Sequence, residues 1–492
     1  MVDAWQVDPA DNVATLLRDV AASDQIALAD RSISAGAAIP RGHKVALVPI
    51  ALGAPIIKYG FPIGLARRAI SAGDHVHIDT VATALSGTDE YRFSASPGAV
   101  RLVENALSFK GYMRRDGRVG TRNEIWILPT VGCVARTAQR IAARASARHA
   151  GSVDGVHAFV YPFGCSQLGD DLAGTRRILA ALATHPNAGG VLIIGLGCES
   201  NQLDALIAEV PQDRRAMIRT MIAQLSPDEI AEGEAHVDAL VAQAAQPRTT
   251  VGLDKLVLGV KCGGSDGFSG LTANPLVGRM SDQVAGAGGR VLLTEIPEIF
   301  GAEHLLMARA RNQAVFDRVG QMVNDFKRYF LAHGEPVSEN PSPGNIAGGI
   351  TTLEEKSLGA VQKGGTAPLV DAIGYGEQVK EPGLTLLEAP GNDAVSSTAL
   401  AAAGATMILF TTGRGTPLGA PVPTVKIASN SALAAAKPGW IDFDAGAVLQ
   451  GGIDHAADAL LARIIAIASG ELTAAERNDE REMAIWKRGV TL

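Results

Sequence analysis

The sequence predicts an α/β protein in which a small N-terminal β domain precedes a larger α/β body. In residues 1–97, short apolar segments alternate with glycine turns, a pattern typical of a compact β domain. From about residue 106, apolar strands that end in glycine alternate with alanine-rich amphipathic segments. Continuous apolar strands with helices between them indicate parallel, Rossmann-like layers, in which ligands bind at the carboxyl ends of the strands.

The N-terminal domain is predicted to begin with a helix at Val13–Ala21. A linker at Ser94–Asn105 is predicted to follow the domain. Four strands are expected between helix and linker, at Gln25–Leu28, Lys44–Val48, Pro55–Lys58 and His75–Ile78.

The body divides into a middle region, 106–246, and a C-terminal region, 251–492, at a polar break that contains Pro247. The two regions either share one sheet or form two. Thr473 and Glu476 have the spacing of a capping box before a final helix. The expected strands are Glu124–Leu128, Ala158–Tyr161, Val191–Ile194, Leu256–Val260, Val291–Leu293 and Met407–Phe410.

Composition excludes several classes of protein. Of 492 residues, 47% are hydrophobic and 19% are charged, so the chain is not disordered or fibrous. The net charge of -7 argues against a nucleic-acid surface. The longest apolar stretch, about Ala399–Phe410, is shorter than the roughly 20 residues that span a membrane. The acidic start, with Asp3 and Asp8, has no apolar core of a signal peptide, so we expect a cytoplasmic protein without a disulfide framework.

Two histidines and one lysine in the N-terminal domain are candidate functional residues. His75 and His77 alternate on a predicted strand, so both rings project from one face, as a divalent metal requires. Surface or core histidines are the alternative. Lys58 lies in an otherwise apolar strand. Such a lysine either acts as a base or anchors a carboxylate. The alternative is that it only extends its amine to solvent.

Each of the four cysteines follows a predicted strand and adjoins a glycine. Thiolates at strand ends bind iron or zinc, and three of them can hold an iron–sulfur cluster with one open iron. Small buried cysteines at tight strand ends are the alternative, and we expect a colourless protein with a mononuclear metal. The four residues are Cys133, Cys165, Cys198 and Cys262.

Acidic residues gather at the same strand ends, where each either caps a helix or takes part in chemistry. They are Asp170, Asp171, Glu199, Asp266, Glu295, Glu298 and Glu303.

Three glycine-rich segments fit known functions poorly. Gly263–Gly267 matches G-x-S-x-G, which would make Ser265 a hydrolase nucleophile, but a loop rather than a helix is expected to follow. Neither Gly195–Ser200 nor Gly413–Gly419 has the glycine spacing of a dinucleotide fingerprint, so no nucleotide cofactor is expected. Their backbone N–H groups, with Arg414, can still hold a carboxylate.

Longer motifs resemble the altronate/galactarate dehydratase family over nearly the whole chain, and the ending Gly489–Leu492 resembles its altronate branch. The motifs are Lys58–Gly64, His75–His77, Gly117–Glu124, Pro129–Cys133, Gly164–Asp171, Gly195–Glu199, Lys261–Asp266, Thr272–Pro275, Glu295–Glu303, Gly344–Asn345, Gly348–Lys356, Pro390–Asp393 and Phe410–Pro417.

This resemblance implies a small β-clip (SAF-like) domain before the α/β body, and dehydration of a sugar acid, D-altronate first, to a 2-keto-3-deoxy acid. It also implies dependence on iron, for which Fe²⁺ is expected and Mn²⁺ is an alternative. The partner is then the small-molecule substrate, with no nucleic acid and no membrane, and a homo-oligomer is compatible with the sequence.

The residues assigned to this chemistry follow from the motifs. Where the family is expected to continue His-x-His with histidine and asparagine, this chain has Asp79 and Thr80. Asp79 is assigned as a substitute oxygen ligand, and a different substrate is the alternative. The catalytic candidates are Lys58, His75, Ser265, Asp266 and Asp393; the substrate-binding candidates are Lys356, Arg414 and Asn345; the metal candidates are His75, His77 and Asp79.

Four other functions remain as alternatives. Within lyases, these are elimination of sulfite from a sulfonated hydroxy acid such as sulfolactate, and dehydration of an aldarate such as galactarate. A serine hydrolase acting through Ser265 and a non-catalytic sugar-acid sensor are the alternatives from other classes.

Overall fold

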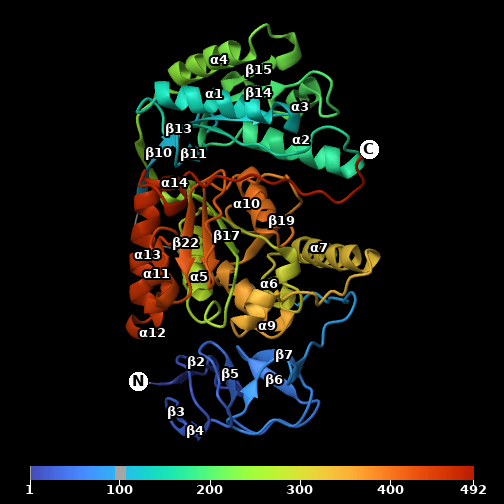
Figure 1. Ribbon diagram of the computed structural model, residues 1–492, viewed down its shortest axis with the longest axis vertical. Helices are drawn as coiled ribbons and strands as arrows, with labels where there is room; N and C mark the ends of the chain where they lie inside the picture. Colours follow the sequence, from blue (N-terminus) through green and yellow to red (C-terminus); the bar gives the residue numbers. More distant parts are fainter. Residues whose placement is uncertain (1, 95–106) are drawn as a thin grey trace.

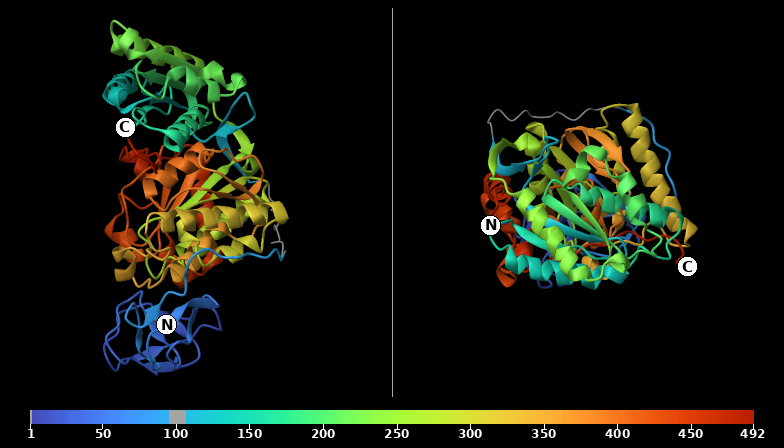
Figure 2. Two further views of the ribbon diagram at one scale, coloured as in Figure 1. Left: turned by 90° about the vertical axis from the view of Figure 1, so that its right-hand side faces the viewer. Right: turned by 90° about the horizontal axis from the view of Figure 1, so that it is seen from above.

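A computed structural model describes residues 2–94 and 107–492. Figure 1 shows three stacked parts: the N-terminal part in blue at the bottom, the C-terminal region at the centre and the middle region at the top. The turned view in Figure 2 shows the same stacking. All but the first residue of the predicted linker Ser94–Asn105 lie outside the described residues. Among these residues, no helix combines the length and apolar composition needed to cross a bilayer.

The N-terminal part consists of short antiparallel strands in three small sheets, ordered β1-β2-β5-β8, β6-β7-β9 and β3-β4. The strands are β1 (Ala4–Trp5), β2 (Val13–Leu16), β3 (Gln25–Ala27), β4 (Ser32–Ser34), β5 (Lys44–Ala46), β6 (Pro55–Lys58), β7 (Phe61–Ala66), β8 (His75–Val76) and β9 (Val81–Ala82).

The predicted helix at Val13–Ala21 is wrong, because Val13–Leu16 is strand β2. All four residues of β2 are buried, and the strand pairs with both β1 and β5. A short segment that is buried on both faces obtains its backbone partners from neighbouring strands, and this pairing outweighs local helical preference. The predicted strands at Gln25, Lys44 and Pro55 are confirmed.

The middle region has a parallel four-stranded sheet ordered β13-β12-β14-β15. The strand predicted at Ala158–Tyr161 lies earlier than expected, at Gly155–Ala158. The elements are β12 (Glu124–Pro129), a 3₁₀ turn η1 (Gly132–Val134), α1 (Ala135–Arg148), β13 (Gly155–Ala158), α2 (Gly169–Ala183), β14 (Ala188–Gly195), α3 (Leu203–Glu209), β15 (Ile218–Ile222) and α4 (Glu229–Ala244).

A small antiparallel sheet, ordered β11-β10-β16, joins the middle region to the rest of the chain. Its strands are β10 (Ser108–Met113), β11 (Val119–Gly120) and β16 (Thr249–Gly252). Because β10 enters the region and β16 leaves it, the predicted break near residue 247 lies beside the region's first strand.

The C-terminal region contains its own parallel seven-stranded sheet, ordered β19-β20-β18-β17-β21-β22-β23, so the two regions do not share a sheet. Its strands are β17 (Val257–Cys262), β18 (Arg290–Leu293), β19 (Leu369–Ile373), β20 (Gly383–Leu387), β21 (Met407–Thr412), β22 (Thr424–Ala428) and β23 (Phe443–Asp444).

Helices cover both faces of this sheet, and a shared apolar core that includes Trp126 and Phe410 joins it to the middle region. The predicted capping box at Thr473 and Glu476 is present. The helices are α5 (Ala273–Gly286), α6 (Glu303–Met307), α7 (Gln313–Ala332), α8 (Pro343–Ala347), α9 (Leu353–Ala360), α10 (Asp393–Ala402), α11 (Ser431–Ala436), α12 (Val448–Gly451), α13 (Ile453–Ala468) and α14 (Ala474–Arg477).

Candidate active site

The carboxyl end of the seven-stranded sheet carries a buried cluster of lysines and acids. Lys261, in β17, places its Nζ 2.9 Å from Glu295 Oε1 and 2.7 Å from Asp393 Oδ1. Ser396 Oγ lies 2.8 Å from the same nitrogen. Burial lowers the pKa of Lys261, but the two carboxylates outweigh burial and hold it above its ordinary value. Lys261 is therefore a fixed positive charge.

Glu295 follows β18 directly and has a left-handed backbone, with φ of 72°. A non-glycine residue in this conformation is strained, and such strain gathers at functional sites. The bend brings Glu295 Oε2 to 3.0 Å from the backbone nitrogen of Cys262, which donates a hydrogen bond to it. Burial raises the pKa of Glu295 to about 6, so this carboxylate exchanges a proton near neutral pH.

Cys262 and Glu298 complete the cluster. Cys262 Sγ lies 3.3 Å from Glu298 Oε2 and 3.0 Å from Lys363 Nζ. Burial raises the pKa of Cys262 to about 12, so the thiol keeps its proton. Burial also raises the pKa of Glu298, but Lys356 Nζ, 2.9 Å from Glu298 Oε1, and the other nearby lysines bring it below its ordinary value.

The ligand atoms of Cys262, Glu295 and Glu298 lie within 4.8 Å of one another, a spacing that fits a divalent metal. Within 2–94 and 107–492, this is the only such triplet of histidine, cysteine or acidic ligand atoms.

The N-terminal domain contributes two buried lysines to the neighbouring helix α9. Lys44 Nζ and Lys58 Nζ each lie 2.8 Å from one oxygen of Glu355. Burial lowers the pKa of Lys44 to about 8. Burial opposes the charge of Lys58 as well, but Glu355 outweighs it, so the pKa of Lys58 is raised and this lysine stays protonated.

Three histidines of the N-terminal domain stack beside the α8 loop. His43 Nδ1 lies 3.0 Å from His75 Nε2, and the His77 ring lies 4.8 Å from the His43 ring. His43 Nε2 is 3.4 Å from the carbonyl oxygen of Ala347, and His77 Nε2 is 3.0 Å from that of Ile346. Burial lowers the pKa of His75 to about 4, so its imidazole is neutral at pH 7.

Three of the predicted residues form the loop between these groups. Asn345 Nδ2 donates to the Ser265 carbonyl at 2.8 Å. Asp266 accepts from Ser269, Phe268, Ser429 and Asn430, so its carboxylate is occupied in holding the loop. A cavity of about 10 Å³, room for about one water, is lined by Tyr59, Ser265, Asp266, Glu355 and Lys356, among others.

Three of the predicted site residues, Asp393, Arg414 and Asp79, are at least partly exposed to solvent. The side chain of Asp393 is 35% exposed, so the Lys261 cluster reaches solvent there. Arg414 is exposed beside Gly264, whose carbonyl accepts from its backbone nitrogen. Asp79, predicted as a metal ligand, points elsewhere: its side chain is 65% exposed and its nearest charged partner is Arg68, at 3.4 Å. The structure does not bring Asp79 into the histidine cluster.

The structure does not bring the four cysteines together. This corrects the sequence analysis, which names all four as candidate ligands of one cluster. Cys262 is buried in the seven-stranded sheet, whereas Cys133, Cys165 and Cys198 are exposed in the middle region. A cluster held by all four is therefore excluded by the separation of the two sheets.

Four residues of the site are absent from the sequence-derived assignment: His43, Lys44, Glu355 and Lys363. Lys44 carries the same signal as Lys58, a lysine in an apolar strand, and could have been found by it. His43 and Glu355 have no such signal, because their partners lie far away in the sequence.

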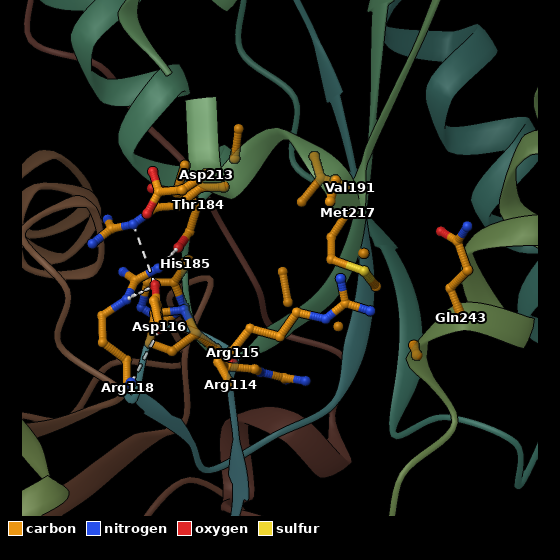
Figure 3. A pocket seen from close by; sticks show the side chains of 18 of the residues that line it. Arg114, Arg115, Asp116, Arg118, Thr184, His185, Val191, Asp213, Met217 and Gln243 are labelled. Atoms are coloured by element: carbon orange, nitrogen blue, oxygen red, sulfur yellow. Dashed lines mark hydrogen bonds and ion pairs between the residues drawn. The ribbon is translucent and has the colours of Figure 1, made fainter. Parts of the chain in front are cut away.

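A second pocket, of about 150 Å³, lies at the other end of the middle sheet, where β14 begins. Figure 3 shows its arginines, Arg114, Arg115 and Arg118. Arg114 donates to Asn123 and to the carbonyls of Arg122 and Pro186, and Arg118 donates to Asp116 and to the Thr184 carbonyl. Because these donors are occupied and the pocket lies away from the carboxyl strand ends, it is not the candidate active site.

Family models match three successive parts of the chain. Residues 3–84 match the altronate/galactarate dehydratase SAF domain, and residues 111–245 match the second domain of D-galactarate dehydratase/altronate hydrolase. Residues 253–491 match the C-terminal domain of D-galactarate/altronate dehydratase.

Curated relatives match over almost the full length. The chain is 49% identical to altronate dehydratase of Escherichia coli (strain K12) and 47% identical to that of Bacillus subtilis (strain 168), each over 99% of both chains. It is 32% identical to galactarate dehydratase (L-threo-forming) of Escherichia coli (strain K12), over 88% of this chain and 86% of the relative. The resemblance inferred from the motifs is confirmed, and the chain belongs to the altronate/galactarate dehydratase family.

Proposed function

We propose that this protein is a hydro-lyase that converts D-altronate to a 2-keto-3-deoxy acid. The observation that carries the proposal is the cluster of Lys261, Glu295 and Asp393 at the carboxyl strand ends, in a chain with close altronate dehydratase relatives. Galactarate and a sulfonated hydroxy acid such as sulfolactate are the alternative substrates.

The chemistry requires positive charge near the substrate carboxylate. Removal of the proton from C2 places additional negative charge on that carboxylate, and fixed cations stabilise the developing dianion. Lys356 is held protonated by Glu298, and Arg414 is exposed at the rim, so these two groups supply the anionic subsite. Asp393 separates Lys261 from solvent at the opening of the cluster.

Glu295 is the proposed general base. Its carboxylate takes the C2 proton and returns one to the C3 oxygen, so that C2–H and C3–O break while a C2=C3 bond and water form. The enol product then becomes the 2-keto-3-deoxy acid. Lys58, predicted as a base, is better suited to fixing charge, because Glu355 keeps it protonated.

The His43–His75 pair offers a divalent metal two neutral nitrogen ligands, which the Cys262 triplet does not. His43 faces the Ala347 carbonyl through Nε2, which directs its Nδ1 toward His75 Nε2; a histidine oriented by a backbone carbonyl is a common arrangement around a metal. Two ligands at about 2.1 Å from one ion and at right angles stand about 3 Å apart, the separation of His43 Nδ1 and His75 Nε2. By contrast, Lys261, Lys356 and Lys363 already compensate the charge of the triplet.

We therefore assign Fe²⁺, with Mn²⁺ as the alternative, to His43 and His75. His77 stacks on His43, but the ligand atoms of the three histidines do not all lie within 4.8 Å of one another. When bound, a divalent ion supplies Lewis acidity toward the substrate carboxylate or hydroxyl. Ser265, Asp266 and Asn345 position the loop that separates this cluster from Lys356. The domain division at 97/106 and 246/251, a cytoplasmic location and a homo-oligomer remain predictions.

The substrate assignment is tested with anaerobically purified, Fe²⁺-loaded protein. D-altronate, galactarate and sulfolactate are supplied separately, and the 2-keto acid and sulfite are measured. We expect 2-keto acid from D-altronate at the highest kcat/KM. Sulfite from sulfolactate, or a preference for galactarate, would select the corresponding alternative.

His43→Ala is expected to weaken Fe²⁺ binding by about 10- to 100-fold, because it removes one of the two nitrogens that face each other. Equilibrium dialysis under argon measures this affinity without reference to turnover. His236→Ala, on α4, is the matched control and keeps full affinity. Unchanged binding in His43→Ala with lost binding in Cys262→Ser would assign the ion to the buried triplet instead.

Ser265→Ala distinguishes a lyase from a serine hydrolase. We expect a reduction in dehydration of about 10- to 1000-fold if the hydroxyl donates one hydrogen bond to the transition state. No histidine of the described residues hydrogen-bonds the Ser265 hydroxyl, so labelling by a fluorophosphonate is not expected. Stoichiometric labelling of Ser265, with no 2-keto acid from any sugar acid, would reject the dehydratase.

A further inference from the structure

Three glycine–cysteine pairs lie at the same level on one edge of the middle sheet. They follow β12, β13 and β14, which are adjacent parallel strands. Pro129 of β12 pairs with Ile194 of β14, and Cys133 and Cys198 each lie four residues beyond this pair. Cys165 lies in the loop after β13, on the other side of β12. Parallel strands thus deliver three thiols to one edge.

The glycine before each cysteine lets the three loops approach closely. A Cβ on Gly132 would lie 2.9 Å from the Pro162 oxygen, and one on Gly164 would lie 2.1 Å from the Thr130 oxygen. A Cβ on Gly197 would lie 2.6 Å from Gln224 Oε1. At Gly132 and Gly164 the nearest atoms are backbone, so only glycine permits these contacts without displacement of the neighbouring loop, and Gly197 has a φ of 129° that favours glycine.

Hydrogen bonds join the three loops directly. The backbone nitrogen of Gly132 donates to the Phe163 oxygen at 2.8 Å, and that of Asn201 donates to the Gly164 oxygen at 2.9 Å. Ser166 N also donates to Ser200 Oγ at 3.2 Å. The loop that carries Cys165 is therefore attached to the loops of both other cysteines.

All three thiols are exposed, although free cysteine is among the most buried residue types. Gln224 Nε2 donates to Cys198 Sγ at 3.6 Å. The three side chains are therefore accessible to a ligand at this edge of the sheet.

The spacing distinguishes between two classes of metal site. A tetrahedral zinc at about 2.3 Å from each sulfur places the sulfurs about 3.8 Å apart. These three sulfurs are not within 4.8 Å of one another, because the Cys262 set is the only such triplet of ligand atoms in the part of the chain that the structure describes. An iron–sulfur cluster accepts a wider spacing, since each thiolate binds a different iron.

We propose that Cys133, Cys165 and Cys198 ligate an iron–sulfur cluster in which a further iron has no protein thiolate. Each thiol releases its proton as its sulfur binds iron. Ferrous and ferric iron enter the cluster in the oxidation states they keep there, and inorganic sulfide supplies the bridging atoms, so assembly needs no separate oxidant. The open iron faces solvent and accepts an oxygen ligand such as water or a hydroxy acid. This site is separate from the Lys261 cluster and does not rest on the proposed dehydration.

The experiment measures colour, iron and acid-labile sulfide in the full chain, purified without oxygen and reconstituted with Fe²⁺, Fe³⁺ and sulfide. We expect broad visible absorption and stoichiometric sulfide in the wild type and in Cys262→Ser. Cys133→Ser, Cys165→Ser and Cys198→Ser should each lose at least most of both signals. The exposed positions of these three residues favour folded variants, and circular dichroism verifies the fold.

The amount of acid-labile sulfide distinguishes this cluster from a mononuclear iron. A mononuclear iron at the histidines or at the Cys262 triplet contains no sulfide. Iron without sulfide in the wild type overturns the proposal. Sulfide that persists in all three exposed-cysteine variants, or that is lost only in Cys262→Ser, overturns it as well.

Discussion

Glu295→Gln is expected to lower kcat for dehydration by about 10²- to 10⁴-fold, the usual contribution of a general base. The amide keeps the shape of the side chain and can still face Lys261, but it cannot take a proton. KM should change little, because the proposed anionic subsite at Lys356 and Arg414 is intact. Steady-state kinetics with D-altronate measure both quantities.

The pH dependence gives a second readout for Glu295. Its pKa is raised to about 6, and a base must be deprotonated to act. In the wild type, kcat should therefore fall about tenfold per pH unit below pH 6 and level off above it, and this acid limb should vanish in Glu295→Gln. Glu377→Gln, at an exposed glutamate, serves as the control. An unchanged limb in Glu295→Gln, with most activity retained, would assign the proton transfer elsewhere.

Glu355→Gln is expected to destabilise the protein by about 3–5 kcal/mol, the usual cost of removing one partner from a buried ion pair. Lys44 and Lys58 are both buried, and each contacts one Glu355 oxygen, so the substitution leaves two ammonium groups without their anion. Chemical denaturation measures the loss. Glu354→Gln is the matched control. Glu354 is next to Glu355 in the sequence and is buried at the same domain contact, but it accepts hydrogen bonds from uncharged donors.

The sign of the pH effect follows from the lowered pKa of Glu355. Burial raises this pKa, but Lys44 and Lys58 outweigh burial and bring it far below the ordinary value of 4.5. The carboxylate therefore contributes stability that is present above about pH 4.5 and is lost as pH falls toward the folded-state pKa. Glu355→Gln should lack this part of the acid dependence. If the stability of the wild type and of Glu355→Gln fell equally at low pH, Lys44 and Lys58 would have to be compensated by groups other than Glu355.

The strands of the body could be predicted because their signal is local. Glu124–Leu128 and Met407–Phe410 are continuous apolar runs that end near glycine, and buried parallel strands have this pattern. Val13–Leu16 was predicted incorrectly because its pattern is short and its backbone partners, β1 and β5, come from other parts of the chain. Sheet membership is likewise non-local, so the sequence alone could not separate Cys262 from the other three cysteines.

The candidate site was predictable to the extent that strand ends identify it. Ser265, Asp266 and Asp393 follow strands or open a helix at the carboxyl edge, so topology places them together. Glu355 was not predictable, because its role depends on two lysines that only the folded chain brings to it. His43 was missed for the same reason, since its partner His75 lies on another strand.

The Lys44–Glu355 contact has a consequence for how the protein is made. The two residues are 311 positions apart, so Lys44 leaves the ribosome long before the Glu355 carboxylate that pairs with it in the folded protein. Chains with such distant contacts fold slowly, because loop closure precedes the stabilising interaction. Until α9 has been synthesised, Lys44 and Lys58 lack the Glu355 carboxylate that compensates their charge in the folded protein. The contact between the N-terminal domain and α9 therefore forms only after most of the chain has been made.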